Sequence, residues 1–273
     1  MTDSYAVIGN PVAHSKSPWI HAEFARQSRQ DLEYLRIEAP LDGFRRAVDE
    51  FRAAGGRGAN VTLPFKDQAY LYCQHAVTER ARAAGVVNTL VFENGVARGD
   101  NTDGVGLLRD LTVNLGRKIA GARVLLLGAG GAAQGVLAPL IEARPRRLVV
   151  ANRSADKARA LARRYGADAG GGYGELRGEQ FDLLINATSA GLTGEAPPLA
   201  QDAFAPRALG YDLVYGRDTP FLAMARAAGA EACDGSGMLV EQAAESFLLW
   251  RGVRPATAAL LAALREANAR ARS

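Results

Sequence analysis

The sequence has few cysteines and no long hydrophobic run. Cys73 and Cys233 are its only two cysteines, and neither has the spacing to a histidine that a metal site requires. We therefore expect a reducing compartment, the cytoplasm, and no bound metal. Apolar runs such as 124–127 are too short to cross a bilayer, so we expect no membrane contact. Asp3 and Gly9 interrupt the first residues, so no signal peptide is expected.

Blocks of like charge are also missing. The net charge of +4 is spread among many arginines, which favours small anionic ligands only weakly and gives no support for nucleic-acid binding. We find no fixed-period repeat and no low-complexity linker. With 273 residues, of which 48% are hydrophobic and 23% charged, the composition is that of a globular protein large enough for two domains.

Residues 60–66 read Asn-Val-Thr-Leu-Pro-Phe-Lys and combine a strand end with a lysine. The apolar stretch 58–63 predicts the end of a buried strand, and Pro64 stops it because proline lacks the N–H that a ladder requires. Asn60 and Thr62 then project from one face, with Lys66 just beyond the strand at the start of a helix. Open α/β sheets bind ligands at the carboxyl ends of their strands. Taken alone, the motif also fits a solvated surface lysine.

Strand and helix patterns alternate along the first hundred residues. Ser17 before Pro18 predicts a helix start with the serine as its cap, and Asp42 is a candidate cap for a helix that carries Phe44. The other elements we expect are strands at 6–9 and 32–37, a helix at 67–84, and a hairpin of 86–92 and 96–98 around Asn94-Gly95.

From residue 103 onward the alternation is more regular. The expected elements are helices at 105–115, 155–165 and 220–228 and strands at 123–127, 148–151, 181–186 and 209–214. This order predicts a parallel, doubly wound, Rossmann-like sheet. We expect two α/β domains, 1–102 and 103–237, with a candidate hinge near 101–104. The C-terminal residues 238–273 predict helices that return to the first domain.

The run Gly128-Ala129-Gly130-Gly131-Ala132-Ala133 follows an expected strand and opens a helix. Its spacing fits G-x-G-x-x-(G/A), in which the first glycine permits a tight turn and the second lets backbone approach a pyrophosphate. The small third residue allows close packing of helix against strand. Because a helix N-terminus also offers free N–H groups to phosphates, the sequence predicts a dinucleotide-binding turn.

The segment Asn152-Arg153-Ser154 indicates which dinucleotide is bound. Sites for NAD usually carry an acidic residue here to hold the ribose hydroxyls, whereas this chain has Asn152 and an arginine that can grip a 2′-phosphate. Ser154 can cap the following helix at the same time, so a structural role is compatible with phosphate binding. We therefore predict NADP as the cofactor.

Further motifs follow one another along nearly the whole chain. They are Gly9-Asn10-Pro11, His14-Ser15-Lys16-Ser17-Pro18, residues 60–66, Val87-Asn88-Thr89, Gly99-Asp100-Asn101-Thr102-Asp103-Gly104, Asn186-Ala187-Thr188-Ser189, Tyr211-Asp212-Leu213-Val214-Tyr215 and Gly237-Met238-Leu239-Val240-Glu241-Gln242. With the two cofactor motifs, this ordered set resembles the NADP-dependent shikimate dehydrogenases of the shikimate/quinate dehydrogenase family. The resemblance implies reversible reduction of 3-dehydroshikimate to shikimate by NADPH, in the shikimate pathway of aromatic amino acid biosynthesis.

The resemblance also implies roles for particular residues. Lys66 would be the catalytic acid/base, and Asp103 would act with it and contact substrate. The other implied substrate-binding residues are Ser15 and Ser17, for the carboxylate, and Asn60, Thr62, Asn88, Tyr215 and Gln242. The implied cofactor-binding residues are Gly128, Ala129, Gly130, Gly131, Ala132, Asn152, Arg153, Ser154, Lys157, Thr188, Leu213, Gly235 and Met238.

Ketone reduction gives a physical reason for a lysine at position 66. Hydride arrival places negative charge on the carbonyl oxygen, and an ammonium can stabilise that charge and donate the proton. A nearby Asp103 would raise the lysine pKa, whereas desolvation would lower it. Hydroxyls at a helix start, Ser15 and Ser17, suit an anion, although capping alone also explains Ser17. With Lys66 as the acid, His21 is expected to be structural.

Three alternatives stay open at this point. A dual-specificity quinate/shikimate dehydrogenase would share these motifs, although Arg153 favours NADP over NAD. A tRNA-linked reductase would require a catalytic cysteine in a matching motif, and neither Cys73 nor Cys233 lies in one. A non-catalytic protein that senses shikimate and NADP would be expected to lack Lys66 or Asp103. The expected partners are small molecules, with either a monomer or a homodimer.

Overall fold

The computed structural model describes residues 2–270, apart from the side chains at 192 and 193. The chain divides into two compact units. The first runs through Gly106 and includes Val240–Leu260; the second comprises Leu107–Leu239 and the described residues from Leu261 onward. Each unit contains helices and a sheet of its own. The predicted α/β fold class is therefore confirmed.

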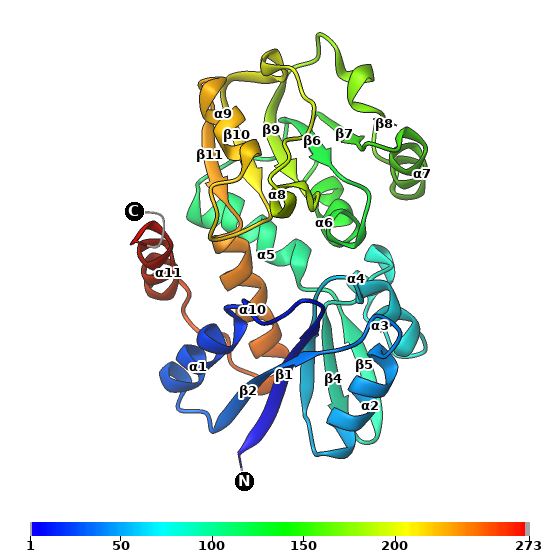
Figure 1. Cartoon of the computed structure of the whole chain (residues 1–273), viewed down its shortest axis with the longest axis vertical. Helices are drawn as coiled ribbons and strands as arrows, with labels where there is room; N and C mark the ends of the chain where they lie inside the picture. Colours follow the sequence, from blue (N-terminus) through cyan, green and yellow to red (C-terminus); the bar gives the residue numbers. More distant parts are fainter. Residues whose placement is uncertain (1, 271–273) are drawn as a thin grey trace. The chain divides into compact units, whose positions relative to one another are not determined.

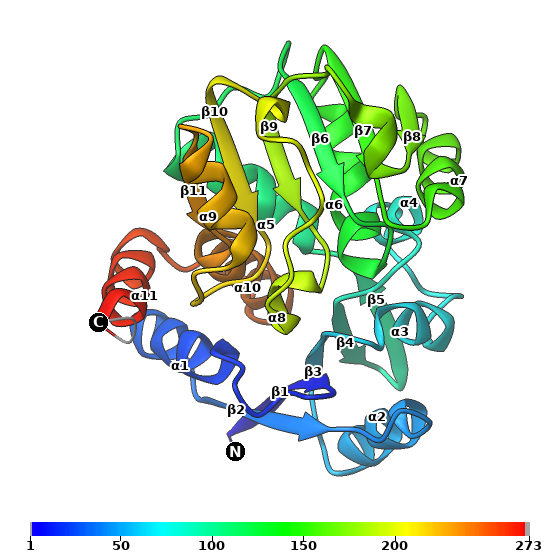
Figure 2. The same ribbon diagram turned by 45° about the horizontal axis from the view of Figure 1, so that its top comes forward.

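The first unit is built on a mixed sheet with the strand order β2-β1-β3-β4-β5. The strands β1, β2 and β3 are parallel, whereas β4 and β5 continue the sheet antiparallel. Helices α2 and α3 lie side by side (Figures 1 and 2). Phe44 stacks on Phe65 with ring centroids 5.2 Å apart. The elements are β1 (Asp3–Gly9), α1 (Ser17–Ser28), β2 (Leu32–Glu38), α2 (Phe44–Ala53), β3 (Gly58–Val61), α3 (Lys66–Tyr72), α4 (Glu79–Ala84), β4 (Thr89–Glu93) and β5 (Val96–Asp100).

Two predicted caps and one predicted strand end are wrong. Helix α1 begins at Ser17 itself, and the Ser17 N–H donates to the Ser15 hydroxyl at 3.2 Å, so Ser17 is not the cap. Gly43, not Asp42, precedes α2, because the Gly43 N–H closes a turn on the Pro40 carbonyl. Strand β3 already ends at Val61, so Pro64 does not end it.

The predicted helix at 67–84 is in fact two helices, α3 and α4. The backbone between them pairs with the strand β5: the Gly99 N–H donates to the Ala76 carbonyl, and the Thr78 N–H donates to the Gly99 carbonyl. These N–H and C=O groups cannot also serve a continuous helix. Thr78 then caps α4 by accepting from the Ala81 N–H.

The second unit is built on a parallel sheet with the strand order β11-β10-β9-β6-β7-β8. Figure 1 shows β9 beside β6, where the strand order reverses. In such sheets the ligand crevice lies at this switch point. Its elements are η1 (a π-helical turn, Asp110–Asn114), β6 (Arg123–Leu127), α6 (Gly131–Glu142), β7 (Arg147–Ala151), α7 (Ala155–Tyr165), β8 (Ala169–Gly171), η2 (Tyr173–Leu176), β9 (Phe181–Asn186), α8 (Ala190–Thr193), η3 (Gln201–Ala203), β10 (Phe204–Asp212), α9 (Pro220–Ala227) and β11 (Glu231–Asp234).

Three helices carry residues of both units. They are α5 (Asp103–Arg109), α10 (Ser236–Arg251) and α11 (Ala258–Arg270). The predicted helix at 105–115 thus corresponds to α5 followed by the π-helical turn η1. The C-terminal helices expected from residue 238 onward correspond to α10 and α11, with Ala271 outside the described residues.

The strand β6 shows why this region of the sequence is apolar without alternation. Val124 and Leu126 face one hydrophobic cluster, and Leu125 and Leu127 face another, so helices cover both faces of the sheet. Among residues 2–270, no helix is both long enough and apolar enough to span a membrane.

Candidate active site

The first unit holds Lys66 in a partly buried ion pair. Phe65 is fully buried against the core, which places Lys66 as the first residue of α3. The Lys66 ammonium lies 2.6 Å from Oδ2 of Asp103, and the two side chains are only 12% and 7% exposed. Lys66 is therefore not the solvated surface lysine that the motif alone allows.

Asn88 fixes the other carboxylate oxygen of Asp103. The Asn88 Nδ2 donates to Asp103 Oδ1 at 2.9 Å. The Asn88 Oδ1 accepts from the Thr102 backbone N–H at 2.8 Å and from the Thr89 hydroxyl at 2.9 Å. Because a backbone N–H can only donate, the amide cannot flip, and its NH₂ group must face Asp103. Each oxygen of Asp103 therefore receives a hydrogen bond, one from Lys66 and one from Asn88.

A buried hydroxyl on α10 connects the polar side chains around Asn88. The Ser246 hydroxyl accepts from Asn60 Nδ2 at 2.9 Å and lies 2.8 Å from the Thr89 hydroxyl. It also lies within reach of the Gln242 carbonyl, at 3.1 Å. The Asn60 carbonyl oxygen in turn accepts from the Tyr34 hydroxyl at 2.7 Å. These hydrogen bonds fix the orientation of the Asn60 amide, with its oxygen toward Tyr34 and its NH₂ group toward Ser246.

Three more residues of the predicted substrate set belong to the same unit. Gln242 lies within 3.3 Å of Asn88 Nδ2 through its Oε1, so the structure brings Gln242 to Asn88 and Asp103. Ser15 and Ser17 are both buried, at the start of α1, and the Ser15 carbonyl accepts from the Arg36 guanidinium at 2.7 Å.

The two remaining residues of the predicted substrate set are Thr62, which follows β3, and Tyr215, which follows β10. Thr62 is half-buried after the end of β3, where its N–H donates to the Ile8 carbonyl. Tyr215 belongs to the second unit, after β10. Their place beside a substrate stays a prediction.

His21 is buried close to this network, but its two ring nitrogens make no hydrogen bond within residues 2–270. Its ring stacks on Tyr34 with centroids 4.3 Å apart. Burial lowers the pKa of His21 to about 3, so the ring is neutral at physiological pH. A neutral, enclosed imidazole is consistent with the structural role predicted for His21.

In the glycine-rich turn of the second unit, Gly128 and Gly130 differ in why glycine is suited to the position. Gly128 has φ = 111°, and a Cβ there would lie 3.0 Å from the Ala187 carbonyl oxygen, so glycine is required by the turn itself. Gly130, the residue before α6, has an ordinary φ of −94°, and a Cβ there would meet nothing within 4 Å. The open space at Gly130 suits a ligand that approaches the backbone, as a pyrophosphate does.

Arg153, predicted to grip a 2′-phosphate, and Lys157, implied to bind the cofactor, are both exposed. Arg153 and Lys157 follow β7 and form no ion pair with any residue that the structure describes. Asn152 Nδ2 donates to the Ser154 carbonyl at 3.1 Å, which fixes the turn between β7 and α7. Ser154 precedes α7 as predicted, but its hydroxyl makes no capping hydrogen bond.

A buried carboxylate connects the ends of β9 and β10. Asp212 accepts from Asn186 Nδ2 at 3.0 Å and from the Thr219 hydroxyl at 2.6 Å, and burial raises the pKa of Asp212. The Asn186 Oδ1 accepts from the Thr188 hydroxyl at 2.7 Å, and the Asn186 carbonyl accepts from the Leu213 N–H. The network thereby positions Thr188 and Leu213, both predicted to contact cofactor.

Sequence reasoning missed several of these residues. Thr219 precedes Pro220 at the start of α9, a cap signal that could have been recognised. Ser246 carries no local signal, and the motif that contains Thr89 does not indicate the role of its hydroxyl, because both residues act through partners far away in the chain.

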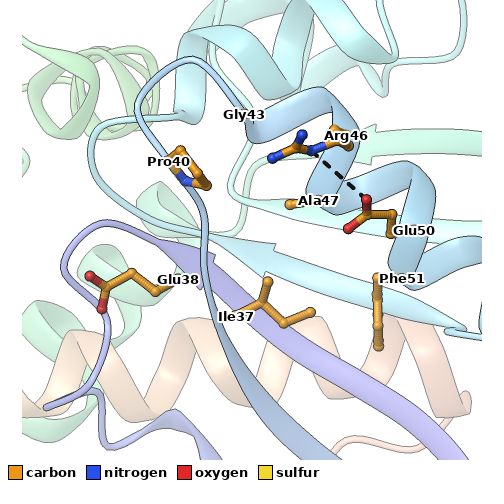
Figure 3. Close-up of a pocket in the computed structure, with 8 residues that line it drawn as sticks. All are labelled: Ile37, Glu38, Pro40, Gly43, Arg46, Ala47, Glu50 and Phe51. Atoms are coloured by element: carbon orange, nitrogen blue, oxygen red, sulfur yellow. Dashed lines mark ion pairs between the residues drawn. The ribbon is translucent and has the colours of Figure 1, made fainter.

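One pocket of the first unit lies apart from these residues. It has a volume of about 220 Å³. Figure 3 shows an ion pair between Arg46 and Glu50 of α2. The two charged groups lie 3.8 Å apart, and both side chains are exposed. Its lining residues are Ile37, Glu38, Pro40, Gly43, Arg46, Ala47, Glu50 and Phe51. None of the predicted site residues is among them. Within 2–270, no three His, Cys, Asp or Glu side chains are grouped to hold a metal ion.

Three family models match the chain. The substrate binding domain of shikimate dehydrogenase matches residues 7–90, and shikimate/quinate 5-dehydrogenase matches residues 110–193. The C-terminal domain of shikimate 5′-dehydrogenase matches residues 235–265.

Known proteins are similar over nearly the whole chain. The shikimate dehydrogenase (NADP(+)) of Aromatoleum aromaticum is 59% identical, covering 96% of this chain and 97% of its own length. The crystal structure of an Ael1 enzyme from Pseudomonas putida is 49% identical with a TM-score of 0.90, covering 96% of this chain and 98% of that one. Shikimate 5-dehydrogenase of Thermus thermophilus, solved with NADP(H) and shikimate, is 36% identical with a TM-score of 0.87, covering 97% and 100%.

Proposed function

The chain belongs to the shikimate dehydrogenase family, and on this premise we propose that it reduces 3-dehydroshikimate to shikimate reversibly, with NADPH as hydride donor and Lys66 as acid/base. The observation that carries the proposal is the ion pair of Lys66 with Asp103, supported on its far side by Asn88. The reaction belongs to the shikimate pathway of aromatic amino acid biosynthesis. In this proposal the first unit holds substrate and the second holds NADP.

Lys66 supplies the proton in this reaction. When bound, NADPH provides the hydride that joins the carbonyl carbon, and the carbonyl electron pair moves onto oxygen. The Lys66 ammonium donates a proton to that oxygen and becomes an amine, which water reprotonates. In the reverse direction the amine accepts the proton from the shikimate hydroxyl. Positioned proton transfer of this kind contributes about 10²–10⁴ in rate.

Asp103 and Asn88 orient the lysine and the substrate. Asp103 is an anion and can only accept, so it holds the ammonium of Lys66 in place. Asn88 presents its NH₂ group to Asp103 because its oxygen is already taken by the Thr102 N–H and the Thr89 hydroxyl. The second N–H of Asn88 donates to the Thr102 hydroxyl at 2.9 Å. In this proposal ring hydroxyls of the substrate bind at the Asp103 carboxylate and Gln242, and they reach Asn88 by replacing one of these two acceptors.

The cofactor site is proposed at the glycine-rich turn of the second unit. The open space beside Gly130 and the N-terminus of α6 suit the pyrophosphate. The exposed Arg153 and Lys157 suit the 2′-phosphate of NADP, and no acidic residue replaces Asn152 to favour NAD. Thr188, Leu213, Gly235 and Met238 complete the proposed set.

The thiols offer little support for a cysteine-dependent reductase. Cys73 and Cys233 are free, and burial raises the pKa of each to about 12. Such thiols are protonated at neutral pH and are poor nucleophiles. Free thiols also agree with a reducing compartment such as the cytoplasm.

For the oligomeric state of the protein, we propose a monomer or a homodimer.

Steady-state assays with shikimate and quinate, each with NADP and with NAD, test the proposal. We expect shikimate with NADP to give the highest kcat/KM. We expect at least about tenfold preference for NADP, because a hydrogen bond to a charged group contributes about 1.5–3 kcal/mol. Arg153→Ala should abolish most of that preference. Equal turnover of quinate would indicate dual specificity, and tight binding of both ligands without turnover would indicate a sensor.

A further inference from the structure

The second unit contains a fully buried carboxylate that the proposed chemistry does not use. Asp110 begins the π-helical turn η1 and is 0% exposed. It accepts from the Tyr211 hydroxyl at 2.7 Å and from Asn114 Nδ2 at 3.0 Å, and the Arg265 guanidinium lies 3.8 Å away. A buried charge is costly unless several partners satisfy it, so this arrangement requires an explanation.

Tyr211 connects this carboxylate to the start of α10. Its hydroxyl donates to Asp110 and accepts from the Met238 backbone N–H at 3.3 Å. Burial, and then the charge of Asp110, raise the pKa of Tyr211 well above its usual value. The hydroxyl therefore keeps its proton, and the direction of both hydrogen bonds is fixed.

Gly237 allows the same carboxylate to pack directly against the backbone of α10. A Cβ at this position would overlap the carboxylate atoms of Asp110. In the two residues just before it, the Gly235 N–H donates to the Val214 carbonyl at 3.1 Å, and the Ser236 N–H donates to the Asp234 carboxylate. The turn between β11 and α10 is therefore fixed by two contacts: a hydrogen bond to Val214, which follows β10, and the packing of Gly237 against Asp110 of η1.

We propose that Tyr211, fixed by Asp110, is a positioning residue for the nicotinamide end of the cofactor, because its hydroxyl sets the place of Met238 and of the first turn of α10. The inference rests on the proposed function, in which Gly235 and Met238 lie at the nicotinamide. Tyr211 itself lies on β10 and is fully buried, so its side chain is not open to a bound ligand. In this proposal Tyr211 acts by fixing the backbone of Met238, which lies at the nicotinamide.

Binding measurements on the full chain separate the two ends of the cofactor. Titration calorimetry should be carried out with NADPH and with 2′,5′-ADP, which has the phosphorylated adenosine but no nicotinamide. Tyr211→Phe should raise the Kd for NADPH about tenfold, the size of one lost hydrogen bond, and leave the Kd for 2′,5′-ADP within about twofold. Tyr5→Phe is the matched control, a buried tyrosine of the first unit whose hydroxyl accepts from Arg251 at 3.4 Å, and it should change neither Kd.

A second pair of variants keeps the test decisive if Tyr211→Phe does not fold. Asp110→Asn retains an oxygen that accepts from Tyr211 and should bind NADPH within about twofold of wild type, whereas Asp110→Ala should show the same split as Tyr211→Phe. Equal weakening of both ligands, or of neither, overturns the inference while leaving the proposed function intact. A wild-type chain that bound neither ligand would overturn both.

Discussion

At the scale of single residues, the ion pair of Lys66 and Asp103 is better explained by chemistry than by stability. Taking two charges out of water costs several kcal/mol per ion, and a buried pair often contributes no net stability. Here both groups are largely enclosed, at 12% and 7% exposure, and Asn88 adds a third hydrogen-bonding partner. An arrangement of this cost fits a group that must deliver a proton in a fixed direction.

Substitution of Lys66 tests its catalytic role. Lys66→Ala should lower kcat by about 10² or more, with a smaller change in the KM for shikimate, because the proton donor is lost while the substrate contacts persist. Lys66→Arg should also be impaired, since arginine keeps the charge but does not release a proton at neutral pH. Lys118→Ala, an exposed lysine of the second unit, is the control. Retention of more than about a tenth of wild-type kcat in Lys66→Ala would contradict the acid/base role.

At the scale of elements, the turn between β6 and α6 illustrates how a short motif can combine folding and binding. Gly128 has a positive φ and lies against the backbone of residue 187, so it serves the turn. Gly130 has an ordinary backbone conformation and open space beside it, so nothing in the chain itself requires glycine there. The motif therefore contains one glycine needed for the fold and one that we expect the ligand to require.

Two alanine substitutions distinguish these requirements. Gly128→Ala should lower the free energy of unfolding by about 1–3 kcal/mol, because a non-glycine residue at that φ is strained. Gly130→Ala should change it by less than about 1 kcal/mol, yet raise the Kd for NADPH at least tenfold by blocking the close approach of the pyrophosphate. Urea unfolding and NADPH titration measure the two effects. An unchanged NADPH affinity in Gly130→Ala would argue against the proposed site.

At the scale of the whole molecule, the chain passes between its two units three times, after Gly106, Leu239 and Leu260. The family model for the substrate binding domain falls within the first unit, and the one that covers residues 110–193 falls within the second. This division supports the proposal that substrate and cofactor bind to different units. Along the chain, Asp110 lies close to the first crossing, and Met238 lies next to the second.

Hydrogen exchange of the backbone amides tests this assignment of ligands to units. Shikimate alone should slow exchange in the first unit, above all at residues 60–66 and 88–103, because ligand binding stabilises the segments it contacts. The ligand 2′,5′-ADP should slow exchange at residues 128–134 and 152–157 of the second unit. Helix α2, which carries no predicted contact, is the internal control. Protection of only the second unit by shikimate would refute the assignment.

The sequence by itself determined the α/β class, the parallel sheet, the glycine-rich turn and the family. These follow from local periodicity and from motifs whose spacing lies within a few residues, such as the turn at Gly128. It also indicated Lys66 and Asp103 as candidates, though not that they touch. Only the tertiary structure decided that contact, the break between α3 and α4, and the roles of Ser246 and Tyr211. The reason is sequence separation: Ser246 meets Asn60 across 186 positions, and Tyr211 meets Asp110 across 101, so no local pattern records either pair.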